Sequence, residues 1–300
     1  MTAAPFFQYL RQFTQGTLAE LARESWLVRA ERCRMAAEAA LPDTSVELYF
    51  NLGPTGRHIS GRRPRAALPH RAAWVVGPRA KPLFIEKETR DCDIVAIRLV
   101  PWVTRCVLGV PAAELREDMI DLDAFWGSFV QAIRERLDAT ADARTRLAIV
   151  ERAVADRVAR SGGPDDSALV RRLCEAAEKE PSLTVGALAS RFGLTHRRVI
   201  DVFDRTVGLK PKEFHRVRRL RRVFHLTDAL PRLSWTTIAH RCGYYDQAHL
   251  INDFRQLTGV LPSEYVATKS SVGHGFVPHW LAADLADLKL SNASNRIKRL

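Results

Sequence analysis

Histidine and cysteine can bind a metal or act as a nucleophile, and their spacing in this chain favours neither role. His58 and His70 stand alone, without the His-x-His pair and carboxylate that a metal-dependent oxygenase would use. The five cysteines are far apart and form no Cys-x-x-Cys pair: Cys33, Cys92, Cys106, Cys174 and Cys242. We therefore expect reduced thiols, no disulfide framework and no metal site.

Sequence motifs for other reactions are also missing. The chain has no Gly-x-x-x-x-Gly-Lys-Ser/Thr loop to hold phosphates and no Gly-x-Ser-x-Gly turn to present a nucleophilic serine. None of its cysteines lies in the Pro-Cys-His setting that a DNA-repair methyltransferase would need. We predict a protein that is not an enzyme, with no catalytic residues and no cofactor.

Basic residues are concentrated in one part of the chain. The formal net charge is +12. Residues 171–269 contain 18 Lys and Arg against 10 Asp and Glu, whereas residues 1–166 contain 24 against 22. This asymmetry predicts a surface that meets a polyanion, although an arginine-rich proteome would give a similar total. The run Arg216–Arg222 is either part of that surface or the solvated face of a helix.

The same basic region contains one unit twice, from Pro181 to Phe214 and from Pro231 to Tyr265. At an offset of fifty, the first copy matches the second at five positions: Pro181/Pro231, Leu183/Leu233, Ala189/Ala239, Arg191/Arg241 and Gly193/Gly243. The offset between the copies then grows by one residue, and the match continues: Phe203/Phe254, Gly208/Gly259, Pro211/Pro262, Glu213/Glu264 and Phe214/Tyr265. A repeat of this size indicates one supersecondary module used twice.

Each copy predicts two short helices on either side of a glycine turn. In the first copy Thr184 and Thr195 are the expected caps and Gly193 the turn; in the second the corresponding residues are Ser234, Asp246 and Gly243. The pattern is that of a helix-turn-helix, whose second helix enters the major groove of DNA.

Longer motifs connect this region to a known family. They are Ala189-x-x-x-Gly193, Phe203-x-x-x-x-Gly208-x-x-Pro211-x-x-Phe214, Ile238-Ala239-x-x-Cys242-Gly243-Tyr244-Tyr245-Asp246-Gln247 and Gly259-x-x-Pro262-x-x-Tyr265. On these motifs, about 100 of the 300 residues resemble the AraC-type (AraC/XylS) transcription regulators. The resemblance implies seven helices, with a long helix at Lys212–Leu226 joining the two modules so that both enter the same DNA face.

The resemblance also implies which side chains face DNA. The expected base-contacting residues are His196, Arg197, Ile200, Asp201, Gln247, Ala248 and Asn252, and the expected phosphate-contacting residues are Arg198, Arg205, Arg255 and Arg218. Arginine can bind guanine through two hydrogen bonds, and glutamine or asparagine can do so with adenine. Asp201 could accept from cytosine, or it could orient Arg197 and Arg205 at four-residue spacing. Ile200 could contact a thymine methyl group or pack internally.

The first half of the chain has a different pattern. Short β-rich runs at residues 46–50, 73–76, 83–85 and 94–100 are followed by helices with apolar residues between Leu122 and Leu137 and between Leu147 and Val158. We expect an α+β protein: a β-rich regulatory domain with two trailing helices (1–160), a linker (161–166), an all-α domain of two tandem helix-turn-helix motifs (167–268) and a tail (269–300).

The stretches Leu41–Gly53 and Trp74–Pro78 resemble a small β-rich domain often joined to AraC-type readers. In the wider family this position holds an effector-binding or dimerising module. Four aromatic residues could line an effector pocket or simply form the core: Trp74, Phe84, Trp102 and Trp126. The alternative is a protein-interaction or dimerisation module that binds no ligand.

The complete expectation is a sequence-specific transcriptional regulator that binds double-stranded DNA. We expect it to respond to a small-molecule effector, to contact RNA polymerase if it is an activator, and to be able to form a homodimer. No run of eighteen apolar residues exists to span a membrane, so a cytoplasmic location fits best.

Overall fold

The computed structural model describes residues 7–31, 37–53, 59–60, 72–86, 91–116, 119–161, 167–180, 183–230, 232–267 and 276–277. Its first half contains a six-stranded antiparallel sheet in the order β1-β2-β8-β4-β6-β9. The strands are β1 (Phe7–Phe13), β2 (Ala22–Ala30), β4 (Glu47–Asn51), β6 (Ala73–Val76), β8 (Cys92–Leu99) and β9 (Met119–Asp121). The linker expected at 161–166 lies outside the described residues after Ser161, and so does the tail except Phe276 and Val277.

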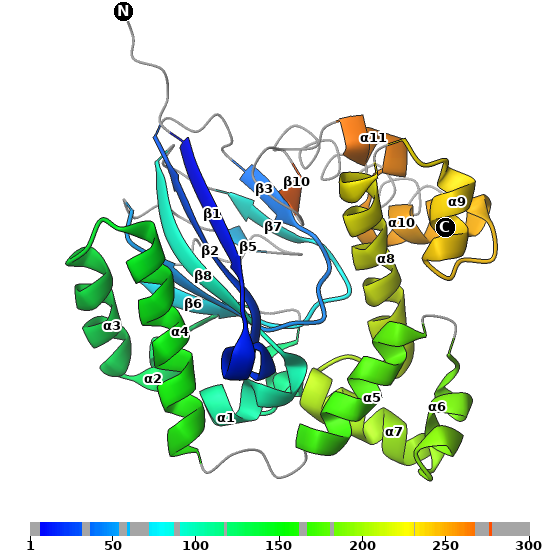
Figure 1. Cartoon of the computed structure of the whole chain (residues 1–300), viewed down its shortest axis with the longest axis horizontal. Helices are drawn as coiled ribbons and strands as arrows, with labels where there is room; N and C mark the ends of the chain where they lie inside the picture. The colour runs from blue at the N-terminus through cyan, green and yellow to red at the C-terminus, as the bar shows by residue number, and fades with distance from the viewer. Residues whose placement is uncertain are drawn as a thin grey trace, which may run out of the picture.

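A second, four-stranded sheet has the order β10-β3-β7-β5. Its strands are β3 (Ala37–Ala40), β5 (Ile59–Ser60), β7 (Leu83–Glu86) and β10 (Phe276–Val277). In Figure 1 this small sheet lies between the large sheet and the helices of the second half. The α+β fold class is therefore confirmed, and each predicted β-rich run is a strand.

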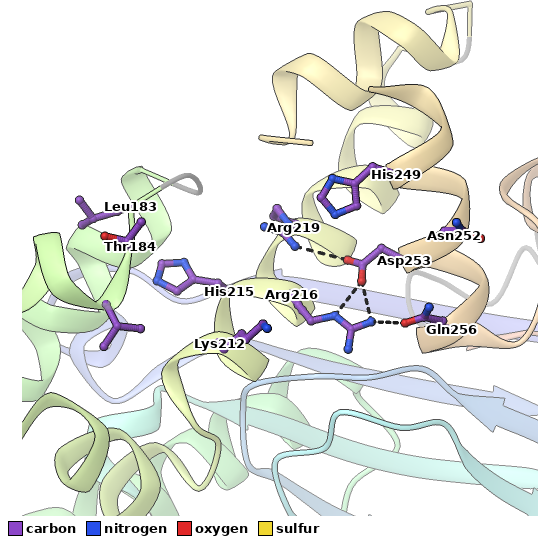
Figure 2. Close-up of a pocket in the computed structure, with 11 residues that line it drawn as sticks. Leu183, Thr184, Lys212, His215, Arg216, Arg219, His249, Asn252, Asp253 and Gln256 are labelled. Carbon is purple, nitrogen blue, oxygen red and sulfur yellow. Dashed lines mark hydrogen bonds and ion pairs between the residues drawn. The ribbon is translucent and has the colours of Figure 1, made fainter. Parts of the chain in front are cut away.

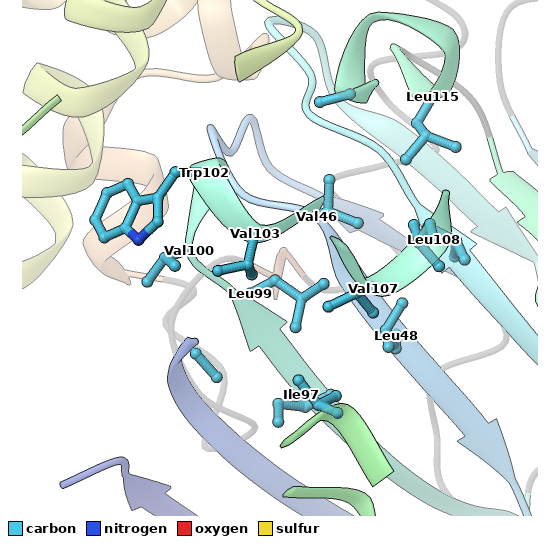
Figure 3. Close-up of a cluster of buried hydrophobic side chains, with 14 of the residues drawn as sticks. Val46, Leu48, Ile97, Leu99, Val100, Trp102, Val103, Val107, Leu108 and Leu115 are labelled. Carbon is cyan, nitrogen blue, oxygen red and sulfur yellow. The ribbon is translucent and has the colours of Figure 1, made fainter. Parts of the chain in front are cut away.

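Both faces of the large sheet are buried, because successive residues of a strand point to opposite sides. Leu48 and Ile97 belong to the main core, shown in Figure 3 with Val46, Leu99 and Val107. Their neighbours on the other face form an aromatic cluster with Trp26, Tyr49 and Trp74, in which the Tyr49 and Trp74 rings stack at 5.4 Å between centroids.

Helices after β8 complete the first domain. They are η2 (Pro101–Val103), α1 (Thr104–Leu108), η3 (Ala112–Leu115), α2 (Asp123–Trp126), α3 (Phe129–Asp138) and α4 (Ala143–Arg160), and a 3-10 turn, η1 (Gly16–Glu20), precedes β2. Helices α3 and α4 cover the main-core face of the sheet (Figure 1). The helix expected from the apolar residues between Leu122 and Leu137 is in fact two, since Gly127 adopts φ 54° and ψ −138°, a conformation that glycine alone tolerates.

The second domain has the seven expected α-helices. They are α5 (Ser167–Lys179), α6 (Val185–Arg191), α7 (His196–Val202), α8 (Pro211–Ala229), α9 (Trp235–Arg241), α10 (Gln247–Thr258) and α11 (Pro262–Ala267), and α7 continues into a π-helical turn, η4 (Phe203–Val207). The long helix α8 joins the two repeated units. Both glycine turns are left-handed, at φ 63° for Gly193 and 79° for Gly243.

The two domains share buried contacts. Leu41, just after β3, is fully buried in the same cluster as Leu220 and Phe224 of α8. Arg116 donates to the carbonyl oxygen of Gly208 and forms an ion pair with Asp204 at 2.6 Å. The first domain therefore touches both the first helix-turn-helix and the helix that joins the two.

Candidate nucleic-acid interface

Each recognition helix begins at the predicted cap. The Thr195 hydroxyl accepts a hydrogen bond from the Arg198 backbone N–H at 3.1 Å, which starts α7. Asp246 Oδ1 accepts from the His249 N–H at 2.7 Å, which starts α10. A side-chain cap satisfies a backbone donor that the first turn would otherwise leave free, so it fixes where the helix begins.

The sequence-predicted base-contacting residues occupy the outer faces of these helices. Five of them are exposed: His196, Arg197, Gln247, Ala248 and Asn252. Ile200 and Asp201 are half-buried. The opposite faces are anchored in the core by Val199 and Val202 in α7 and by Leu250 and Phe254 in α10.

Asp201 has a different environment from the one that its spacing suggested. Among the described residues, no ion pair joins Asp201 to Arg197 or Arg205. Its carboxylate is therefore not held by either arginine, and Arg197 is not oriented through it. Accepting from a cytosine amine stays a prediction for Asp201.

Three of the four expected phosphate-contacting arginines are exposed beside the recognition helices: Arg198, Arg205 and Arg255. Arg218 is placed elsewhere. Its guanidinium lies 3.2 Å from the carboxylate of Glu178 and lines the cavity between the two domains. The expectation of a phosphate contact at Arg218 does not fit this position.

A groove of about 820 Å³ lies between the two helix-turn-helix units, along α8 (Figure 2). Lys212 and Arg216 line it from α8, and Asn252 and Gln256 line it from α10. Arg216 is held in place, because its Nε donates to Asp253 at 2.7 Å and its terminal nitrogen donates to Gln256 at 2.9 Å. The sequence analysis missed Lys212, although its four-residue spacing from Arg216 puts the two cations on one helical face. Arg216 belongs to the basic run that was expected to be either part of a DNA-facing surface or the solvated face of a helix.

His215 borders the same groove and is 7% exposed. Neither ring nitrogen has a hydrogen-bond partner in the part of the chain that the structure describes. Burial, and to a lesser extent the neighbouring Arg219, lower the pKa of His215 to about 4. The imidazole is therefore neutral at pH 7, and it packs edge-on against Phe214.

A second cavity, of about 620 Å³, lies between the domains. The first domain contributes Arg23 and Trp102 to its lining, and the second contributes Glu178, Arg218 and Arg221. Arg23 and Arg218 share the single carboxylate of Glu178, and the buried Nε–H of each arginine has no partner among the described residues. Burial lowers the pKa of Arg218 to about 10, so it is a poorly solvated cation at pH 7.

Of the aromatic candidates for an effector site that the structure describes, Trp74 lies in a different cluster from Trp102 and Trp126. Trp102 lines the cavity between the domains, and its ring N–H donates to the Glu20 carbonyl oxygen at 3.2 Å. Trp74 is buried in the aromatic cluster, and Trp126 is buried in the main core, where its ring N–H donates to Val107. The Phe84 side chain lies outside the described residues.

Comparison with known proteins identifies the second domain. Residues 188–268 match the family model described as a helix-turn-helix domain. This part of the chain is an AraC-type DNA-binding domain. The protein is accordingly a DNA-binding transcriptional regulator with an AraC-type reader at its C-terminal side.

Two structures of ToxT are among the solved structures that resemble this chain. An apo variant of ToxT from Vibrio cholerae is 8% identical, with a TM-score of 0.51 over 82% of this chain and 98% of that chain. ToxT bound to an unsaturated fatty acid is 8% identical, with a TM-score of 0.49 over 86% of this chain and 94% of that chain. At such identity the likeness shows the fold alone.

A probable AraC family regulator from Rhodopseudomonas palustris is 28% identical over 33% of this chain and 94% of that chain, with a TM-score of 0.29. No curated protein sequence matches the chain significantly. Among the described residues, no helix is long and apolar enough to cross a membrane, and no three His, Cys, Asp or Glu side chains are grouped to hold a metal ion.

Proposed function

We propose that the chain is a one-component regulator that reads an asymmetric DNA site and responds to a small organic anion. The observation that carries the DNA part is the pair of capped, exposed helices α7 and α10, joined by a single continuous helix, α8. Such helices enter two successive major-groove segments about 34 Å apart. Because Arg197 and Asn252 differ chemically, the two half-sites differ in sequence.

Base readout is tested by determining binding preferences on randomised duplexes. Arg197→Ala and Asn252→Ala should each flatten the preference at a separate position, at a cost of roughly 1–3 kcal/mol on the preferred site. Arg255→Ala should weaken all sequences alike and reduce the salt slope by about 0.9. Arg152→Ala, on an exposed face of the first domain, is the control and should change neither. Unchanged profiles for Arg197→Ala and Asn252→Ala would exclude these two side chains as base readers.

The effector part rests on the cavity between the domains. Two half-buried arginines there share one glutamate, so a carboxylate entering the cavity could accept from the unpartnered Nε–H groups of Arg23 and Arg218. Arg218 and Arg221 belong to α8, which joins the two readers. A ligand bound to Arg218 would therefore act on the element that sets the spacing of α7 and α10.

A thermal-shift screen of small monocarboxylates, each beside its neutral amide, tests the effector. A true effector at 100 times its Kd stabilises the protein by about 2.7 kcal/mol. Arg218→Gln should abolish that stabilisation, whereas Arg222→Gln, on the same helix but outside the cavity, should retain it. Carboxylates that never stabilise the protein, or that act equally on Arg218→Gln, would refute the anion site.

One observation favours a second candidate function for the first domain, a protein-interaction or dimerisation module. Strand β1 is at the edge of the large sheet, and Phe13 at its end is 62% exposed. An open strand edge can pair with a second chain. Sedimentation of wild type and Phe13→Lys would test this: a dimer that the lysine disrupts supports the module, and a monomer in both excludes self-association through β1.

A further inference from the structure

The amide of Gln247 is held by a neighbouring helix. Gln247 is the first residue of α10, the position from which a recognition helix reaches base edges. The hydroxyl of Thr236, on α9, donates a hydrogen bond to Gln247 Oε1 at 3.0 Å. The carbonyl oxygen of the amide is therefore turned toward α9, and its NH2 group points away from α9 and can donate to a ligand.

This arrangement changes which base the glutamine can read. Binding adenine with two hydrogen bonds needs both halves of the amide, because the carbonyl oxygen accepts from N6 while the NH2 group donates to N7. Guanine offers two acceptors, N7 and O6, at the same edge. An amide oxygen can accept two hydrogen bonds, so the bond from Thr236 acts through orientation: it turns the oxygen toward α9 and leaves the NH2 group as the half of the amide that points away from α9, which matches guanine better than adenine.

The first repeated unit provides an internal comparison. At the offset of the repeat, Gly186 stands where Thr236 stands, and His196 stands where Gln247 stands. Gly186 has no side chain with which to hold His196, so only the second unit has this restraint. Within α9 the other hydroxyls are used locally, since Ser234 caps the helix and contacts Thr237 Oγ1 at 2.9 Å.

We propose that Thr236 is a positioning residue for DNA specificity: by holding the carbonyl oxygen of Gln247, it makes α10 read guanine rather than adenine. The proposal rests on the proposed function, which places α10 in a major groove. It predicts that the specificity of the second half-site is set jointly by two helices of the same unit.

Binding of full-length protein to randomised duplexes, read by sequencing, tests the proposal. Gln247→Ala identifies the base pair read by Gln247, where the wild type should prefer guanine. Thr236→Val, which keeps the shape and removes the donor, should move that preference toward adenine by roughly 5- to 150-fold. Thr236→Ser keeps a hydroxyl and should retain the guanine preference. Both positions are exposed, so the folded state should tolerate the changes.

Two outcomes overturn the inference alone: a wild-type preference for adenine at that base pair, or a profile that Thr236→Val leaves unchanged while Gln247→Ala flattens it. A wild-type protein with no sequence preference would instead overturn the proposed function. A preference that Gln247→Ala does not alter anywhere removes Gln247 as a base reader, and the inference falls with it while the DNA function stands.

Discussion

Replacing Asp43 by asparagine should loosen the hold of the first domain on α8. Asp43 is 2% exposed, and its carboxylate lies 3.4 Å from Arg221 and 3.6 Å from Arg98. Burial alone would raise the pKa of Asp43, but Arg98, Arg221 and Arg79 hold it well below its usual range. The carboxylate is thus charged at neutral pH and compensates a buried cation of the second domain.

The magnitude follows from what the substitution leaves behind. Arg98 keeps its ion pairs with Glu24 and Glu47, whereas among the described residues Asp43 is the one carboxylate paired with Arg221. Removing one partner of a buried pair costs about 3–5 kcal/mol. We expect a loss of about 3 kcal/mol, at the lower end of that range, because Glu24 and Glu47 still attract Arg221.

A double-mutant cycle with Arg221→Met isolates the pair. Urea unfolding, followed by tryptophan fluorescence and by circular dichroism, gives the free energy of unfolding of each variant where the two signals coincide. The double variant should lose less than the sum of the single losses by roughly 0.5–3 kcal/mol. Single losses that add within about 0.5 kcal/mol would show that Asp43 and Arg221 do not interact energetically, and would refute the reasoning.

Three other predictions concern stability and capping. In a thermal melt, Gly208→Ala should destabilise the protein more than Gly193→Ala. Both glycines have a left-handed backbone, which costs alanine about 1–2 kcal/mol. A Cβ at Gly208 would in addition lie 2.6 Å from the Ala112 carbonyl oxygen. Equal losses would contradict the interdomain contact. Since the folded-state pKa of His215 is about 4 and the unfolded value about 6.5, stability should fall by about 2–3 kcal/mol as the pH drops from 6.5 to 4. Urea midpoints of His215→Phe should fall less over that range. Asp246→Ala should lower the free energy of unfolding in urea by about 1 kcal/mol and weaken DNA binding. Unchanged DNA binding would show that this cap does not position α10 for DNA.

The helices and turns of the second domain could be predicted from the sequence because they depend on local chemistry. All four expected caps and both glycine turns are present in the structure. Such features involve residues three or four apart, so spacing alone can reveal them. The helix expected between Leu122 and Leu137 was predicted less accurately, since Trp126 and Ile133 keep a helical period on both sides of Gly127 while the backbone turns between them.

Contacts between distant segments could not be predicted in this way. Helical periodicity correctly places Arg218 outside the core of the second domain, but it does not show that the first domain covers that surface. Strand β1 was missed because it is an edge strand in which polar residues such as Gln8 and Arg11 interrupt the apolar ones. The separation of Trp74 from Trp102 and Trp126 likewise depends on which face of the sheet each reaches.

The burial of Leu41 among side chains of α8 limits how this regulator can be taken apart. Leu41 of the first domain completes the core of the second helix-turn-helix unit. The second domain expressed alone would therefore have an empty space beside Leu220 and Phe224. Grafting the reader onto a foreign sensor would leave the same defect unless the new partner supplied an apolar side chain there. The second domain therefore cannot be exchanged independently of the first, and a chimaera should keep the segment around Leu41 together with the DNA-binding domain.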